Sequence, residues 1–240
     1  MSGPDAARET TVPGEGGARP RLPHRPGKVV GIGLNYRAHA GDLDAALPVN
    51  APVSFFKAEH TWIGDGEPIA VPDGVGRVTA EAELGLVIGR PCREVTEGNA
   101  LDHVSGACAV LDQTAEEELL KNPRYLSFTK NYATFFAFGP RIMPISDVLA
   151  RTGDLSRISV STVLNGTVQR QDTVAGMLIP PARLIAFLSH VMPLEPGDVI
   201  STGTPGAVPI KPGDEVAAVL DGIMTLRNPV VRGGRGRPAE

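Results

Sequence analysis

The apolar residues of this chain fall in short runs that glycine and proline interrupt, and this pattern constrains the fold more than any other feature. Runs of this length, bounded by turn residues, are typical of β-strands, whereas helices need longer periodic segments. None of them approaches the roughly 18 apolar residues that a membrane-spanning helix requires. The runs are KVVGIGL, PVSFFK, LGLVIG, ACAVLD, ISVSTVLNG, DVISTGT and DEVAAVLDGIMTLRNPVV.

Helical periodicity appears in only a few short segments. They are NYRAHAGDL (35–43), EGNALDHV (97–104) and PPARLIAFLSHV (180–191). The pair Asn165-Gly166, inside an apolar run, predicts a two-residue type I′ hairpin turn. Many strands with few short helices predict a mainly β chain of the α+β class, folded as a barrel or roll.

The composition supports one domain and limits its partners. With 240 residues and 42% hydrophobic content, the chain can bury a sizeable core. We expect flexible ends over 1–27 and 232–240 around a catalytic domain at 28–231. A formal net charge of -4 provides no basic field for nucleic acid or an anionic membrane. Cys92 and Cys108 lack CxxC spacing, and the first residues do not form a secretory signal, so we expect a cytoplasmic protein with reduced thiols.

Three acidic residues form a candidate metal site. Glu81 and Glu83 stand two positions apart, so on a strand both carboxylates project from the same face and repel each other unless a cation lies between them. Asp112 follows the apolar run ACAVL, where a rigid strand can present a ligand to a cleft. Three carboxylates favour Mg²⁺ or Mn²⁺, with Ca²⁺ as a further alternative, over zinc. The competing interpretation is that Glu81 and Glu83 line the exposed face of an edge strand.

A histidine and a lysine are candidates for the chemistry. On a short helix, His39 and Asp42 stand at i and i+3, so the carboxylate can orient the imidazole as a general base for water. Lys130 precedes the apolar stretch ATFFAFGP, where a buried ammonium needs an anionic partner or a substrate. The alternatives are a histidine satisfied by a neighbour at the start of a helix and a lysine whose amine reaches solvent.

The segment from Ser201 to Gly206 is a candidate anion site. It holds Gly203 and Thr204 at the end of an apolar run, and such a turn offers hydroxyls and backbone N–H groups to a carboxylate or oxyanion. A plain structural turn is the alternative.

Taken in order, these segments resemble the fumarylacetoacetate hydrolase family, specifically its short bacterial-type members. The resemblance covers roughly residues 28 to 231. The pieces that carry it are GLNYRAH, PVSFFK, EAELGLVIG, the aspartate after ACAVL, the lysine before the phenylalanines, LNGTVQ, LEPGDVISTGTP and IKPGDEV. It implies a mixed β-sandwich roll with a β-barrel-like core, assembled as a homodimer.

The resemblance also implies roles for individual residues. Three are expected to bind the metal, three to act in catalysis and four to lie in motifs that contact the substrate. The metal ligands are Glu81, Glu83 and Asp112; the catalytic residues are His39, Asp42 and Lys130; the substrate-binding residues are Thr204, Lys57, Tyr36 and Gly203.

One segment departs from the family pattern. After the metal-binding aspartate, family members read close to Asp-x-Thr/Ser-x-Arg-Asp-x-Gln, whereas here Glu116 replaces the arginine and Glu117 the aspartate. The change removes one expected anchor for a substrate anion. It points to a neutral, cationic or differently oriented substrate, or to a changed reaction.

These features lead to a hypothesis about function. We expect a metal-dependent hydrolase that cleaves a carbon–carbon bond in an acylpyruvate or related β-diketone or oxo acid through a metal-bound enolate. Decarboxylation of an oxo acid, enol-keto isomerisation and hydration use the same enolate, and they stay open as alternatives. A non-catalytic or repurposed metal-binding accessory protein is the competing class.

Overall fold

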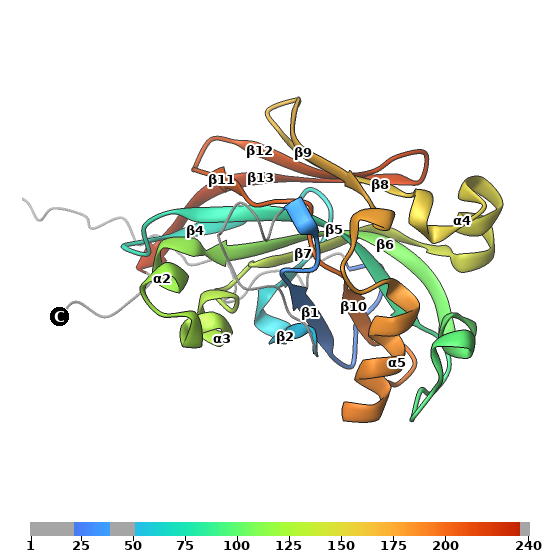
Figure 1. Ribbon diagram of the computed structural model, residues 1–240. Coiled ribbons are helices and arrows are strands. Elements are labelled where there is room, and N and C mark those ends of the chain that lie inside the picture. The colour runs from blue at the N-terminus through green and yellow to red at the C-terminus, as the bar shows by residue number, and fades with distance from the viewer. Residues whose placement is uncertain (1–21, 39–50, 236–240) are drawn as a thin grey trace, which may run out of the picture.

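Two β-sheets form the framework of the protein, whose computed structural model describes residues 22–38 and 51–235 (Figure 1). The larger sheet has eight strands in the order β2-β1-β10-β5-β6-β7-β3, and β11 pairs with β5 beside this path. Its strands are β1 (Val29–Gly33), β2 (Val53–Lys57), β3 (Trp62–Ile63), β5 (Val78–Ile88), β6 (Val104–Ala115), β7 (Phe136–Pro144), β10 (Val199–Ser201) and β11 (Val208–Ile210).

The smaller sheet has five strands in the order β4-β13-β12-β8-β9. They are β4 (Ile69–Asp73), β8 (Ser159–Leu164), β9 (Thr167–Thr173), β12 (Glu215–Leu220) and β13 (Met224–Arg235). In Figure 1, strands β8, β9, β12 and β13 lie on one side of the long strands β5 and β6, while β1, β2 and β10 lie on the other. Because β1, β2 and β10 belong to the same sheet as β5 and β6, their place to one side of these strands means that the larger sheet curls. The predicted mainly β roll is confirmed.

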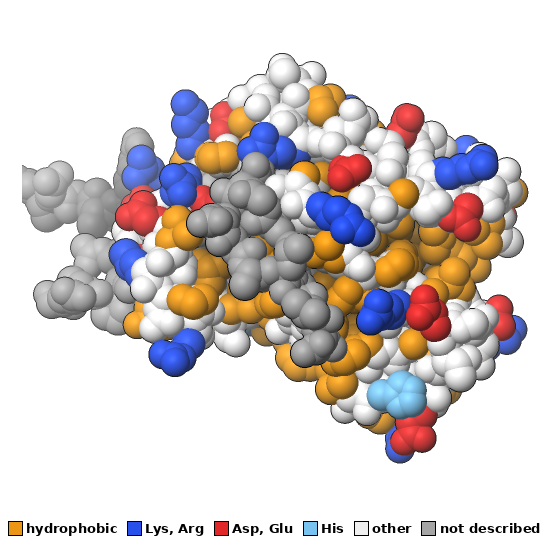
Figure 2. All heavy atoms as spheres, in the orientation of Figure 1, with side chains coloured by type: hydrophobic (Ala, Val, Ile, Leu, Met, Phe, Trp, Pro, Cys, Tyr) orange, Lys and Arg blue, Asp and Glu red, His pale blue; other side chains and the backbone are white. Residues whose placement is uncertain are grey.

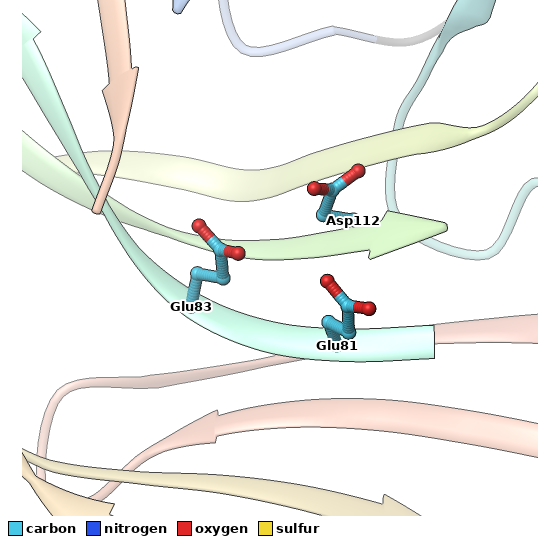
Figure 3. Close-up of side chains that lie close together, drawn as sticks. All are labelled: Glu81, Glu83 and Asp112. Atoms are coloured by element: carbon cyan, nitrogen blue, oxygen red, sulfur yellow. The ribbon is translucent and has the colours of Figure 1, made fainter. Parts of the chain in front are cut away.

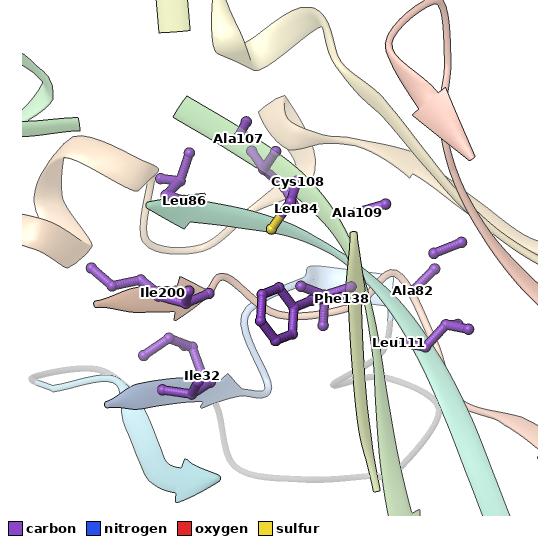
Figure 4. Close-up of a cluster of buried hydrophobic side chains, with 14 of the residues drawn as sticks. Ile32, Ala82, Leu84, Leu86, Ala107, Cys108, Ala109, Leu111, Phe138 and Ile200 are labelled. Carbon is purple, nitrogen blue, oxygen red and sulfur yellow. The ribbon is translucent and has the colours of Figure 1, made fainter. Parts of the chain in front are cut away.

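The core lies around β5 and β6. Every residue of β5 is buried, and so is every residue of β6 except Ser105. Figure 4 shows apolar side chains from these strands packed with Ile32, Phe138 and Ile200 of three neighbouring strands. Strands covered on both faces read as continuous apolar runs, which explains why LGLVIG and ACAVL show no alternation.

The helices are short and lie at the edges of this framework. The α-helices are α2 (Glu116–Lys121), α3 (Leu126–Thr129), α4 (Ile145–Thr152) and α5 (Pro181–Val191). The 3-10 helices are η1 (Glu59–Thr61), η2 (Glu97–His103), η3 (Pro123–Tyr125), η4 (Leu155–Arg157) and η5 (Val174–Gly176). Helix α5 confirms the prediction for 180–191. The predicted segment 97–104 contains the 3-10 helix η2. Of the predicted helix 35–43, residues 35–38 lie within the described chain, and only 37 and 38 of these are helical.

Two strands extend beyond their predicted ends. Asp112 does not close its strand, because the pairing of β6 with β5 continues through Ala115 opposite Val78. Strand β13 runs past the predicted domain boundary at residue 231, because its pairing with β4 reaches Arg235 opposite Asp73. In both cases the hydrogen-bonded partner strand sets the length, which the local sequence does not encode.

The predicted hairpin is confirmed. Asn165 and Gly166 have φ values of 50° and 80°, and the flanking Leu164 and Thr167 pair across the ends of β8 and β9. The Asn165 side chain also donates to Asp214 Oδ1 over 2.9 Å, which connects the turn to the residue just before β12. Positive φ at both central positions is the requirement of a type I′ turn, and asparagine followed by glycine meets it.

Both cysteines are free and buried. Within the described ranges, no helix combines the length and the apolar character needed to cross a membrane.

Candidate metal site and cleft

Three buried carboxylates converge on one face of the larger sheet. Glu81 and Glu83 lie on β5, and Asp112 lies on β6 directly opposite Glu81 in the antiparallel register. Each offers an oxygen within 4.8 Å of the others, and Figure 3 shows the three side chains on one side of the two strands. Strand β5 is interior to its sheet, and these residues are at most 7% exposed. The alternative of an exposed edge strand is therefore wrong.

Hydrogen bonds fix the two glutamates. Ser201 Oγ and the backbone N–H of Gly203 donate to Glu83 Oε2 over 2.5 and 2.8 Å, and Thr114 Oγ1 donates to Glu81 Oε1 over 3.1 Å. Ser201 lies on β10, which pairs with β5. The orientation of the carboxylates is thus set by neighbouring strands before any ligand binds.

Lys130 lies against the carboxylate cluster. Its Nζ donates to Glu81 Oε2 over 2.8 Å and to Asp112 Oδ2 over 2.7 Å, and the residue is 4% exposed. The alternative of a lysine reaching into solvent is therefore excluded. Burial acts to lower the pKa of Lys130, but the charges of Asp112 and Glu81 outweigh it and raise that pKa, so the amine stays protonated.

Lys57 lies on the other side of Asp112, away from the cleft. Its Nζ is 2.5 Å from Asp112 Oδ1, and its side chain is fully buried. The ammonium also donates to three backbone carbonyls. They belong to Gln113, Lys130 and Phe135, at 3.0, 2.5 and 2.7 Å. The residue therefore holds Asp112 and the surrounding backbone in place, a position that differs from the expected substrate contact.

The cluster contains three carboxylates but only two described ammonium groups, those of Lys57 and Lys130. Two ammonium groups balance two of the three carboxylates, and burial followed by the charge of Asp112 raises the pKa of Glu83 to about 8. Glu83 therefore holds a proton near neutral pH unless a cation replaces it. Oxygen donors in this number and spacing, with one acid that ionises only beside a further positive charge, fit a hard divalent ion such as Mg²⁺ or Mn²⁺.

The raised pKa of Glu83 predicts how the EDTA-treated protein responds to pH. Because the folded value of about 8 exceeds the ordinary 4.5, the stabilising contribution is complete below pH 4.5 and is lost as pH rises through 8. We expect unfolding free energy to fall by up to about 1.4 kcal/mol per pH unit in this window. Urea denaturation from pH 5 to 8.5 measures it.

The isosteric variant Glu83→Gln is the matched control, because it keeps the side-chain shape and removes the titration. Its stability should change less with pH than that of the wild type over this window. Parallel profiles for the two proteins would show that Glu83 does not titrate as described.

A cleft of about 420 Å³ opens next to the carboxylates. Three of the predicted residues line it: Glu81, Lys130 and Thr204. The hydroxyl of Thr204 is within 3.2 Å of both the backbone N–H and the carbonyl oxygen of Gly206, so it is positioned by its own turn. The cleft thus joins the carboxylate cluster to a polar turn.

The other predicted residues lie elsewhere. Gly203, with φ of 100°, turns its N–H to Glu83, and a Cβ there would lie 2.7 Å from Asn35 Cβ. Tyr36 is fully buried, and burial followed by the charges of Glu83 and Asp172 raises the pKa of its hydroxyl. His39 and Asp42 lie outside the described residues.

Sequence reasoning missed three contributors to the site. Ser201 and Thr114 hold the glutamates, and the helices α2 and α3 supply a wall of the cleft. The motif STGTP contained Ser201, but only its place on β10 beside β5 reveals its partner.

Comparisons with known proteins agree with this geometry. The sequence profile described as fumarylacetoacetate (FAA) hydrolase C-terminal matches residues 28–231. The crystal structure of 5-carboxymethyl-2-hydroxymuconate delta-isomerase from Mycobacterium smegmatis is 38% identical, with a TM-score of 0.76 over 87% of this chain and 80% of that one.

Two further proteins are similar. The 4-hydroxyphenylacetate degradation bifunctional isomerase/decarboxylase of Escherichia coli is 34% identical over 213 residues, which are 88% of this chain and 48% of that protein. The crystal structure of fumarylpyruvate hydrolase from Pseudomonas aeruginosa in complex with Mn²⁺ and pyruvate is 24% identical, with a TM-score of 0.77 over 85% of this chain and 89% of that one. At that identity the likeness is one of fold.

Proposed function

This chain belongs to the fumarylacetoacetate hydrolase family, as the resemblance implied, and from that premise we propose that it is a Mg²⁺- or Mn²⁺-dependent hydrolase of acylpyruvates or related β-dicarbonyl acids. One observation carries the proposal. Three carboxylates and a protonated lysine converge where a cleft of about 420 Å³ meets the sheet. Such a cluster can bind a cation and hold an oxygen on which negative charge develops.

The metal ligands in this proposal are Glu81, Glu83 and Asp112, which fit a hard cation by donor type and spacing. A bound divalent ion would polarise the substrate carbonyl and stabilise negative charge on its oxygen. Gly203 and Lys57 would support the ligand set, because they hold Glu83 and Asp112.

The reaction is R–CO–CH₂–CO–COO⁻ + H₂O → R–COO⁻ + CH₃–CO–COO⁻ + H⁺. We assign His39, oriented by Asp42, to remove a proton from the attacking water. Water adds to the acyl carbonyl, and the bond between that carbon and the methylene carbon breaks. Lys130 donates a hydrogen bond to the enolate oxygen of the departing pyruvate, and Thr204 binds its carboxylate. The enolate then takes a proton at carbon.

The names of two relatives favour a second candidate. The Mycobacterium smegmatis protein is an isomerase, and the Escherichia coli protein combines isomerase and decarboxylase activities. Isomerisation and decarboxylation also pass through an enolate. Because water is not a nucleophile in either reaction, neither needs a residue that deprotonates water. The products separate the candidates: a carboxylic acid with pyruvate, CO₂, or a tautomer of unchanged composition.

Acetylpyruvate and oxaloacetate test the proposal directly. We expect EDTA-treated protein to gain turnover of acetylpyruvate when Mg²⁺ or Mn²⁺ is added, with acetate and pyruvate formed in equal amounts. The variant Glu83→Gln loses a ligand charge and should need at least about 100-fold more metal for the same rate. Metal-stimulated release of CO₂ from oxaloacetate alone would favour the decarboxylase, and no turnover of either compound would favour a non-catalytic binding protein.

Assembly and location are also part of the proposal. We propose a cytoplasmic homodimer, which rests on the family resemblance and on the two free cysteines. The exposed side chain of Phe56 on β2, 53% accessible, supplies apolar surface at the edge of the larger sheet for such an assembly.

A further inference from the structure

The cleft divides into a polar and an apolar part. Three of its polar lining residues form one hydrogen-bonded cluster, since Glu81 accepts hydrogen bonds from both Thr114 and Lys130. Thr204 also lines this part of the cleft, and the backbone N–H of the preceding Gly203 donates to Glu83. This part suits the dioxygenated end of an oxo acid and leaves the rest of the cleft for the tail of the substrate.

The remaining walls are apolar apart from Glu116 of α2. They come from strands β1 and β2 on one side and from the region of α2 and α3 on the other. The principal residues are Ile32, Val53, Phe55, Leu119, Leu120 and Leu126. Figure 2 shows hydrophobic side chains gathered on the surface over α2 and α3, and Leu120 is 62% exposed. The apolar wall thus continues outward to the surface.

Among the described residues, the charges that line the cleft do not offer a second anion site. Of the lining residues that the structure describes, the charged ones are Glu81, Lys130 and Glu116. Lys130 is engaged by Glu81 and Asp112. Glu116 forms an ion pair with Arg77, so its charge is compensated from outside the cleft, and the arginine is held by that carboxylate.

We propose that the cleft selects substrates whose tail is an uncharged hydrocarbon over substrates whose tail ends in a second carboxylate. This rests on the proposed function for the position of the oxo acid. A tail carboxylate would lose its hydration beside leucines and face Glu116, with no free cation among the described lining residues. Each methylene group buried against the apolar wall should strengthen binding about fourfold.

Binding of two oxo acids of equal carbon number tests the proposal without turnover. We expect the Mg²⁺-loaded protein to bind 2-oxohexanoate at least tenfold more tightly than 2-oxoadipate in isothermal titration calorimetry. The variant Glu116→Gln removes the acidic charge and releases Arg77, so the ratio should fall severalfold. The exposed Glu97→Gln is the matched control and should leave the ratio unchanged.

Turnover provides a second measure. The kcat/KM for butanoylpyruvate should exceed that for succinylpyruvate by at least tenfold. Turnover of acetylpyruvate is measured alongside, because it tests whether the protein is a hydrolase. Equal or tighter binding of 2-oxoadipate, or preference for a tail that ends in an ammonium group, overturns the inference while turnover of acetylpyruvate keeps the proposed function. Loss of all turnover with the binding preference intact overturns the proposed function alone, and absence of binding by either oxo acid overturns both.

Discussion

Replacing Lys130 with methionine is expected to lower kcat for acetylpyruvate by about 10²–10³-fold, the usual effect of removing one donor to a developing oxyanion. The ammonium stays protonated between Glu81 and Asp112, and Lys130 is the one basic residue among the described residues that line the cleft. Methionine keeps most of the side-chain length but donates no hydrogen bond. Steady-state kinetics at saturating Mg²⁺ measures the change.

Metal binding separates this role from a structural one. Lys130 competes with a cation for oxygens of Glu81 and Asp112, so calorimetry should show that Lys130→Met binds Mg²⁺ at least as tightly as the wild type. Lys211→Met, at an exposed position in the turn before β12, is the matched control for both measurements. An unchanged kcat in a variant that still binds metal would remove Lys130 from the mechanism.

Replacing Lys57 with methionine is expected to lower the free energy of unfolding by about 3–5 kcal/mol, the cost of removing one partner from a buried ion pair. The variant leaves Asp112 Oδ1 without its ammonium and three backbone carbonyls without their donor. Burial also lowers the pKa of Lys57 to about 8, against the charge of Asp112, which shows how strongly this amine depends on its partners. Urea denaturation of metal-free protein measures the loss.

A surface lysine gives the comparison for this stability change. Lys211→Met should stay within about 0.5 kcal/mol of the wild type, as exposed substitutions usually do. If Lys57→Met is as stable as Lys211→Met, the buried network around Asp112 does not support the fold. If the variant is too unstable to purify, Lys57→Arg keeps the charge and offers a second measurement, with a smaller expected loss.

Local sequence was sufficient for the strands that lie in the predicted apolar runs and for the hairpin, but not for β3, β4, β7 and β11. Run length, bounding turn residues and the pair Asn165-Gly166 act within a few positions, so the pattern predicts them without knowledge of the partners. The short helices α2 and α4 were missed, because a helix of one or two turns carries little periodicity. The acidic first turn of α2, beginning at Glu116, was the available signal.

The candidate site likewise contains residues whose setting the local sequence predicts and residues whose setting only tertiary packing determines. Alternation along a strand placed Glu81 and Glu83 on one face, and the apolar setting of Lys130 predicted that it needs an anionic partner. Lys57 could not be assigned in this way. Its motif suggested a place near the cleft, whereas the amine is buried against Asp112 and three backbone carbonyls of other segments.

The sequence by itself determined the class of fold, the common face of two glutamates and the need of a buried lysine for an anion, because each depends on neighbours in the chain. Tertiary structure alone decided that Asp112 stands opposite Glu81, that Ser201 reaches Glu83 and that leucines of α2 and α3 face the cleft. Those contacts depend on strand register and on the curl of the sheet, which pairing between distant segments sets.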